Sequence, residues 1–200
     1  MLETPSILRY SLDKVGQLQC DEVRTISRKG SKVLTLDVDR IPVDIGYYLV
    51  GFADGEGSFN VSFRKRRDYP QAPWKVSLCF NVSQRDEAIL RLFQRQLRCG
   101  TMRTRADGVW YFEVNRLEEI IWNVIPFFER FRFLSAKKQR DFAKFKELAL
   151  LMKGGKHLTH DGLRLIVKIR SDMNDGGARR RKYADAQILS LLGESSEAIR

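Results

Sequence analysis

The sequence predicts an α+β fold with an antiparallel β-sheet, because the spacing of its apolar residues changes in a regular way. Residues 44–56 carry apolar side chains at the helical period, and from Gly57 onward apolar and polar residues alternate, as they do in a strand. A helical stretch precedes each of two predicted strand pairs, and more helical stretches follow. The predicted order of elements is therefore αββαββα.

The chain carries a large positive charge. Its 36 Lys and Arg residues against 25 Asp and Glu give a net charge of +11, and 43% of its residues are apolar, which is enough for a real core. A basic protein attracts polyanions, so we expect nucleic acid as the partner and rank an anionic membrane second. No apolar run approaches the ~20 residues that span a bilayer.

The cysteines indicate a reducing environment. Cys20, Cys79 and Cys99 are widely spaced and form no C-x-x-C pair, which argues against a disulfide framework and against structural zinc. The amino terminus lacks the apolar core of a signal peptide. We therefore expect an intracellular protein, in the cytoplasm of a prokaryote or in an organelle matrix.

Residues 1–43 form a polar extension of unknown role, with one predicted strand over 32–38 and a break at Pro42. An irregular segment packed on the main domain is the preferred interpretation. A basic arm that touches DNA through Arg24, Arg28 and Lys29 is the alternative. The main domain is expected over 44–183, followed by a C-terminal helix or tail over 184–200.

The predicted helix over 44–56 starts at Asp44, a candidate N-cap, and ends in a carboxylate between two glycines. Gly51 and Gly55 lie four residues apart on one helical face and leave room for a second helix to approach closely. Glu56 follows where the unpaired carbonyls of a helix end carry partial negative charge. Carboxylate and carbonyl oxygens suit a hard divalent cation, although a glycine-capped helix with solvated acids is the plainer interpretation.

The strands predicted after Gly57 have one apolar and one polar face. Polar and basic side chains alternate along both members of the first pair, and the hairpin around Asp107-Gly108 again places two arginines two residues apart. Such a face can read base edges in a major groove, whereas an ordinary half-exposed sheet would have a polar face as well. The candidate DNA contacts are Asn60, Ser62, Arg64, Arg66, Lys75, Ser77, Asn81, Arg103 and Arg105.

Four more helices are predicted from their apolar spacing and end signals. They cover residues 86–97 with a stop at Gly100, 117–125 with an end at Pro126, 135–153, and 159–172 with Thr159 as cap. The phenylalanines between 127 and 145 are interpreted as core. A basic run at 179–182 follows a glycine turn and is either a solvated loop or a set of phosphate contacts by Arg179, Arg180, Arg181 and Lys182.

The stretch from Tyr48 to Ser58 resembles the signature helix of the LAGLIDADG homing endonucleases, and residues 49–57 align with it without a gap. The resemblance implies a saddle-shaped antiparallel sheet on DNA and a metal-dependent double-strand break in a long pseudo-palindromic target. It also implies an intron-encoded protein. Since the chain holds one copy of the signature, it implies a homodimer whose helices cross. The interface would involve Leu49, Gly51, Phe52 and Gly55.

The resemblance also implies a catalytic centre. Glu56 and the Gly55 carbonyl would bind Mg²⁺, with Mn²⁺ as a substitute and Ca²⁺ supporting binding without cleavage. Gln84 would order water near the scissile phosphate, and Lys138 would stabilise its developing charge. Where some relatives place a further arginine, this chain has Ala88.

Two other functions share this fold and charge. A DNA-binding regulator that had lost its nuclease would keep the basic faces, but Glu56 is intact. An RNA maturase that assists splicing of its host intron would also be basic, and would bind the intron transcript more tightly than duplex DNA at matched salt.

Overall fold

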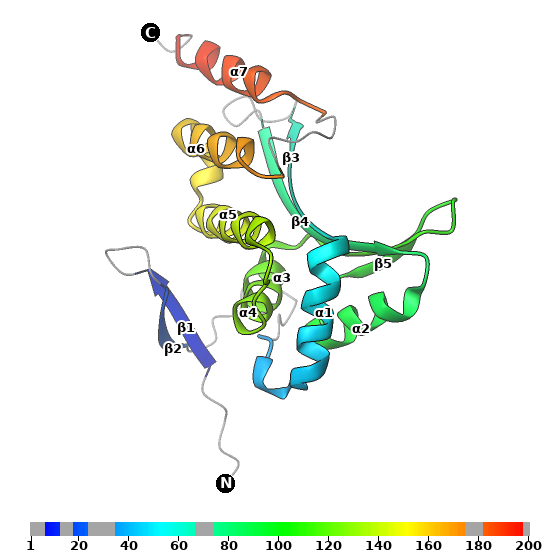
Figure 1. The fold of residues 1–200 in the computed structure, drawn as a ribbon. Coiled ribbons are helices and arrows are strands. Elements are labelled where there is room, and N and C mark those ends of the chain that lie inside the picture. Colours follow the sequence, from blue (N-terminus) through cyan, green and yellow to red (C-terminus); the bar gives the residue numbers. More distant parts are fainter. Residues whose placement is uncertain (1–6, 13–17, 24–34, 67–73, 175–181, 198–200) are drawn as a thin grey trace. The chain divides into compact units, whose positions relative to one another are not determined.

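The computed structural model describes residues 7–12, 18–23, 35–66, 74–174 and 182–197, and it divides into two compact units, 1–35 and 36–200. In the first unit, β1 (Ile7–Leu12) and β2 (Leu18–Val23) form an antiparallel hairpin that was not predicted (Figure 1). Arg24, Arg28 and Lys29, the candidate basic arm, lie outside the described residues.

The prediction of a strand over 32–38 is wrong for residues 35–38, the part of this range that the structure describes. Residues 35–37 are irregular and lead into a 3₁₀ turn, η1 (Val38–Arg40). The Arg40 guanidinium pairs with the Asp37 carboxylate at 2.9 Å, which favours a turn. The Leu36 amide donates to the carbonyl of Trp122 at 3.1 Å, so this segment is bound to a helix and not to the sheet.

Helix α1 (Val43–Glu56) begins directly after Pro42. The prediction that Asp44 caps this helix is wrong. The helix starts one residue earlier, and Asp44 lies within its first turn. A carboxylate in the first turn still stabilises the helix by its favourable interaction with the helix dipole. Gly46 is required by packing, since a Cβ at this position would lie 2.3 Å from the ring of Phe131.

The second unit contains a four-stranded antiparallel sheet in the order β3-β4-β6-β5, and its two long strands curve along their length (Figure 1). The strands are β3 (Gly57–Lys65), β4 (Trp74–Gln84), β5 (Thr101–Thr104) and β6 (Trp110–Val114). Ser58 pairs with Asn81 and Arg64 with Lys75. Because paired residues point to the same side, this register confirms the predicted polar and apolar faces.

The apolar face of the sheet carries the core. Phe59 contacts the rings of Phe128, Phe133 and Phe145. Phe128 and Phe145 come from the helices over 125–130 and 136–153, and Phe133 comes from the segment between them. Phe80 packs in the same way on Phe93 of α2 (Glu87–Leu97). The interpretation of the phenylalanines as core is confirmed.

The helix predicted to end at Pro126 continues through it. α3 (Leu117–Glu119), a π-helical turn η2 (Ile120–Val124) and α4 (Ile125–Arg130) form one continuous helical stretch. Proline has no N–H for the carbonyl four residues before it, which is that of Trp122. The Leu36 amide supplies a hydrogen bond to this carbonyl, so a partner far away in the sequence compensates for the proline.

The remaining predicted helices each begin one residue after the predicted first residue, which serves as the N-cap, and of these three caps only Thr159 was predicted. Ser135 caps α5 (Ala136–Lys153), Asp86 caps α2, and Thr159 caps α6 (His160–Ser171). α2 ends at Leu97, and its C-cap Arg98 adopts the left-handed conformation two residues before Gly100. A short turn η3 (Lys156–Leu158) precedes α6, and α7 (Asp185–Glu197) closes the described chain. None of the described helices has the length and apolar character needed to cross a membrane.

Candidate active site and nucleic-acid interface

The end of α1 presents an exposed carboxylate at a fixed junction. Glu56 is the last residue of α1, Gly57 is the first of β3, and both Gly55 and Glu56 are exposed. A Cβ at Gly57 would lie 2.5 Å from the carbonyl oxygen of Ala53, so only glycine lets the chain pass from helix to strand without a linker. The position of Glu56 is therefore defined by two regular elements.

Asp54 joins this junction to the start of α5. Its carboxylate accepts the backbone N–H of Ser135 at 3.2 Å and also the Ser135 hydroxyl. The same hydroxyl oxygen accepts the N–H of Lys138 at 3.3 Å as the cap of α5. Asp54 therefore positions the first turn of α5, a role that was not predicted.

The Lys138 side chain contacts the backbone of Gly57, the residue that follows Glu56. Its half-buried ammonium donates to the Gly57 carbonyl at 2.6 Å. Burial lowers the pKa of Lys138, and the carboxylates of Asp54, Asp141 and Glu56 oppose that shift. The structure thus brings together two of the predicted catalytic residues, Glu56 and Lys138, on either side of Gly57.

Gln84 lies at the same end of the sheet. Gly57 pairs with Val82, and Gln84 ends β4 two residues further on. Its side-chain oxygen accepts the N–H of Arg85 at 2.8 Å. Among the described residues, no hydrogen bond joins Gln84 to Glu56 or Lys138.

The donor set at the junction suits magnesium better than zinc. The described residues contain no group of three or more His, Cys, Asp or Glu side chains arranged to hold a metal. Glu56 and the carbonyls of the last helical turn supply oxygen only. Mg²⁺ characteristically uses one or two carboxylates with substrate phosphates and water, so a single exposed Glu56 fits that ion.

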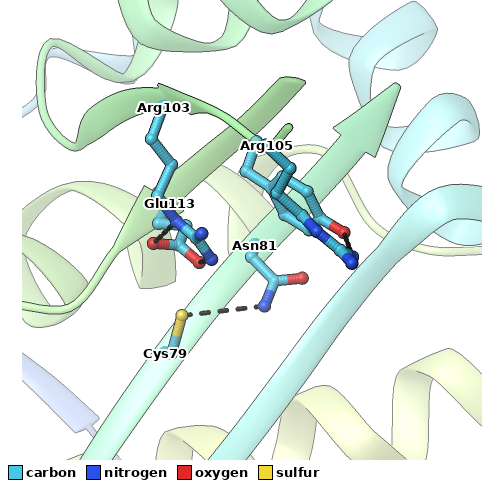
Figure 2. Close-up of polar contacts among 6 residues, drawn as sticks. Cys79, Asn81, Arg103, Arg105 and Glu113 are labelled. Atoms are coloured by element: carbon cyan, nitrogen blue, oxygen red, sulfur yellow. Dashed lines mark hydrogen bonds and ion pairs between the residues drawn. The ribbon is translucent and has the colours of Figure 1, made fainter. Parts of the chain in front are cut away.

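The outer face of the sheet carries hydrogen-bonding side chains in register. Asn60 faces Cys79, Ser62 faces Ser77, and Arg64 faces Lys75 across β3 and β4. Asn81 donates to the Cys79 sulfur at 3.8 Å, as Figure 2 shows. The predicted DNA contacts on these two strands therefore share one surface.

The two arginines of the second hairpin already have protein partners (Figure 2). Arg103 forms a bidentate pair with Glu113, at 2.8 and 2.6 Å, and its guanidinium lies 4.8 Å from the centre of the Tyr111 ring. Arg105 donates to the Tyr111 hydroxyl at 2.9 Å. These hydrogen bonds raise the pKa of both arginines. Glu113 and Tyr111 were missed, although their alternation in β6 places them on the outer face.

The predicted helix-crossing surface is open. A Cβ at Gly51 or at Gly55 would meet nothing within 4 Å. Phe52 is half-buried against Phe93, and Tyr48 on the same stripe is 57% exposed. Leu49 was wrongly assigned to this surface, because it is 0% exposed and belongs to the core of its own chain.

The remaining predicted DNA contacts lie next to, or within, the segments 67–73 and 175–181, which are outside the described residues. Arg66 follows β3 directly, and Lys182 is exposed with its ammonium 5.7 Å from the centre of the Tyr183 ring. Arg179, Arg180 and Arg181 fall outside the described residues.

A match to a protein-family model shows which family the chain belongs to. The model of the LAGLIDADG endonuclease family matches residues 49–149, which run from α1 into α5. The chain belongs to the LAGLIDADG endonuclease family. The match begins within the segment over 48–58 that resembles the signature of this family.

Proteins of similar sequence come from fungi. The chain is 30% identical over 131 residues to "Probable intron-encoded endonuclease 2" of Neurospora crassa, which covers 64% of this chain and 27% of that protein. It is 30% identical over 95 residues to "Probable intron-encoded DNA endonuclease 1" of Mycosarcoma maydis, covering 46% and 32% respectively. The chain thus spans about a quarter to a third of these relatives.

Solved LAGLIDADG structures share the fold. The archaeal intron-encoded homing endonuclease I-Vdi141I, solved with DNA, superposes with a TM-score of 0.68 at 26% identity, over 76% of this chain and 96% of that chain. The homing endonuclease I-TnaI gives 0.60 at 28% identity, over 84% and 100%. I-SmaMI, solved with DNA and calcium, gives 0.62 at 28% identity, over 67% of this chain and 46% of that chain. The α+β fold with its αββαββα order is confirmed.

Proposed function

We propose that this chain is a homing endonuclease that makes a double-strand break in a long, pseudo-palindromic DNA site and is encoded within an intron. The observation that carries the proposal is the exposed Glu56 at the rigid α1–β3 junction, with the Lys138 ammonium 2.6 Å from the next carbonyl. The names of the similar fungal proteins and the DNA in the I-Vdi141I structure support it.

The outer face of the sheet is the proposed DNA-reading surface. Strand pairs of this width enter a major groove, where side chains with donors and acceptors distinguish base pairs. Asn60, Ser62, Ser77 and Asn81 supply such groups. Arg64 and Lys75 would contact phosphates at one end, with Arg66, Arg103, Arg105 and the run over 179–182 as further cationic contacts.

Glu56 and the Gly55 carbonyl would hold Mg²⁺, for which Mn²⁺ could substitute, together with DNA phosphate oxygens. The bound ion would activate water and stabilise the leaving 3′ oxygen. Lys138 would contribute positive charge next to the scissile phosphate, and the contact with the Gly57 carbonyl keeps it there. Gln84, at the same end of the sheet, would orient the attacking water.

A homodimer would supply the second carboxylate that cutting two strands requires. Gly51 and Gly55 leave α1 open for a second copy, and Tyr48 and Phe52 flank them at helical spacing. The chain corresponds to 96% of I-Vdi141I but only 46% of I-SmaMI, as expected of a unit that works in pairs.

We also propose a reducing compartment as its location. Cys79 and Cys99 are free thiols. Burial, as the largest cause, raises the pKa of Cys79 to about 11 and that of Cys99 to about 12. Both thiols would therefore stay protonated and unreactive near neutral pH.

Selection from a random duplex library tests the proposal. Duplexes are captured in Ca²⁺, transferred to Mg²⁺, and the bound and cut molecules are sequenced, with Glu56→Gln as the matched variant. We expect cut molecules that share one pseudo-palindrome, and we expect Glu56→Gln to bind the same site without cutting it. Binding without cutting by the unaltered chain would point to a regulator, and tighter binding of intron RNA than of duplex to a maturase. Magnesium-dependent cutting by Glu56→Gln would remove Glu56 from the metal site.

A further inference from the structure

β3 lies at the edge of the sheet, with β4 as its one neighbouring strand among the strands that the structure describes. Two of its carbonyl groups, two residues apart, accept hydrogen bonds from side chains outside the sheet. The Lys138 ammonium donates to the Gly57 carbonyl at 2.6 Å, and the side-chain amide of Asn174 donates to the Phe59 carbonyl at 3.0 Å. Since the carbonyls of alternate residues point to the same side of a strand, the start of β3 is held along one edge at two points.

Asn174 connects this edge of β3 with α5. It lies three residues after the end of α6, and its backbone N–H donates to the carboxylate of Asp141 at 3.1 Å. Asp141 follows Lys138 by one helical turn in α5, so the two side chains lie on one face of that helix. Asp141 is only 7% exposed, and a buried carboxylate is costly unless it is hydrogen-bonded. The N–H of Asn174 therefore stabilises Asp141 in its buried position.

Position 174 uses two properties of asparagine. Its φ of 52° lies in the left-handed region, which asparagine and glycine adopt more easily than most other residues. In that conformation the backbone donates to Asp141 while the side-chain amide donates to Phe59. Glycine at this position would keep the backbone conformation and the N–H, and would lose only the amide. One substitution can therefore remove the link to β3 and leave the link to α5 intact.

The two links restrict how α5 can move against β3. A single hydrogen bond from Lys138 would allow the helix to turn about that contact. The second link, through Asp141 and Asn174, holds the next turn of the helix to a carbonyl two residues further along β3. The position of the Lys138 ammonium relative to the Gly57 carbonyl, and so to Glu56, is thereby fixed.

We propose that Asn174 and Asp141 are positioning residues, which hold the Lys138 ammonium beside Glu56 in the geometry that cleavage requires. The inference rests on the proposed function, in which Lys138 places positive charge next to the scissile phosphate. A displacement of such a group by about 1 Å can slow a reaction by on the order of 100-fold. Neither Asn174 nor Asp141 was among the site residues predicted from the sequence.

The first test separates cleavage from binding. Asn174→Gly is compared with Gln94→Ala, which removes another hydrogen bond from a side-chain amide to a backbone carbonyl, that of Gly100 at 3.2 Å. We expect Asn174→Gly to cleave about 10-fold more slowly in a single turnover with saturating enzyme, and to bind duplex in Ca²⁺ with native affinity. Gln94→Ala should cleave at nearly the native rate. Equal rates in the two variants would overturn the inference.

A second variant weakens the same link from the side of α5. Asp141→Asn keeps the shape of the side chain but replaces the charged acceptor of the Asn174 N–H with a neutral one. We expect the same separation of cleavage rate from affinity, and thermal unfolding shows that the variants compared are folded. A native cleavage rate in folded Asp141→Asn would overturn the inference.

A double-mutant cycle tests whether Asn174 acts through Lys138. In a Lys138→Met background the ammonium is already absent, so adding Asn174→Gly should change the remaining rate by less than about two-fold. A further loss of about 10-fold would show that Asn174 supports the fold in general, and this result would overturn the positioning role.

The third test needs no DNA. Reductive methylation of the folded chain, followed by mass spectrometry, gives the relative reactivity of each lysine. Lys138 should react slowly in the unaltered chain, because its ammonium is half-buried and hydrogen-bonded, and several-fold faster in Asn174→Gly. Lys75, exposed on β4, serves as the reference and should react equally in both chains. Unchanged reactivity of Lys138 would overturn the inference.

The outcomes separate this inference from the proposed function. Cutting by the unaltered chain, with native rate and native Lys138 reactivity in Asn174→Gly, would overturn the positioning role and leave the endonuclease proposal standing. A faster reaction of Lys138 in Asn174→Gly, in a chain that cuts no DNA, would support the link to Lys138 and overturn the proposed function. Slower cutting at native affinity, together with faster methylation of Lys138, would establish the inference.

Discussion

At the scale of single residues, Asp54 has the largest unexpected role. It accepts two hydrogen bonds from Ser135, 81 positions away, and so connects the end of α1, where we propose that metal binds, with the helix that carries Lys138. Both of these hydrogen bonds join Asp54 to another part of the protein. It acts by holding another group in place.

We expect Asp54→Ala to lower the cleavage rate on saturated enzyme by about 10- to 100-fold while the affinity for duplex DNA stays the same. The free energy of unfolding should fall by about 1 kcal/mol for each hydrogen bond lost. Single-turnover cleavage, binding in Ca²⁺ and thermal unfolding measure the three quantities. Ser135→Ala keeps the backbone N–H to Asp54 and should show a smaller loss of rate. Native cleavage rates in Asp54→Ala would remove it as a positioning residue.

Glu56 and Lys138 could be named as candidates from the sequence, because Glu56 belongs to the segment that resembles the family signature and Lys138 lies where the resemblance implies an active-site lysine. The sequence could not reveal Asp54, since the carboxylate has no distinguishing neighbour in the sequence and its partner comes from another helix. The Arg103–Glu113 pair was missed for a different reason. Alternation showed that both side chains face outward, but their pairing depends on the register of β5 and β6.

At the scale of elements, the direct passage from α1 to β3 depends on Gly57. We expect Gly57→Ala to destabilise the chain by a few kcal/mol, because the added Cβ would lie 2.5 Å from a backbone oxygen that cannot move away. Gly154→Ala is the matched control, since its Cβ would lie 3.6 Å from the nearest oxygen and its backbone φ of −76° suits any residue. Chemical denaturation compares the two variants, and equal midpoints would contradict the argument.

In the hairpin of β5 and β6, we expect a substitution that strengthens the binding of DNA. Glu113→Gln removes an acid from the outer face and releases Arg103 from its bidentate pair. We expect the variant to bind random duplex several-fold more tightly at low salt, with a salt slope steeper by about one. Fluorescence anisotropy over a salt series measures both. Weaker binding would show instead that Glu113 orients Arg103 for DNA.

At the scale of the whole molecule, the open stripe of α1 predicts a dimer that one side chain can prevent. We expect Gly51→Leu to fold normally, because its Cβ meets nothing within 4 Å in its own chain. It should remain monomeric and lose double-strand cleavage, because two helices could no longer approach closely. Sedimentation gives the mass and circular dichroism the fold. A Gly51→Leu dimer that still cuts would place the interface elsewhere.

The order of elements and both faces of the sheet followed from the sequence, because strand alternation and helix caps are local signals. The errors fall where distant segments decide the outcome. Pro126 is accommodated in a helix because Leu36 satisfies the Trp122 carbonyl, and the segment over 35–38 is drawn into that contact instead of forming a strand.

The junction at Gly57 also limits how the recognition of DNA can change during evolution. Since no residue separates the end of α1 from the start of β3, the proposed catalytic Glu56 and the proposed DNA-reading face are held at a fixed distance from each other. Substitutions on the outer face can change which bases are preferred, but they leave the distance from those bases to the cleaved bond unaltered. New targets should therefore differ in base sequence and keep the same distance between the recognised bases and the cleaved bond.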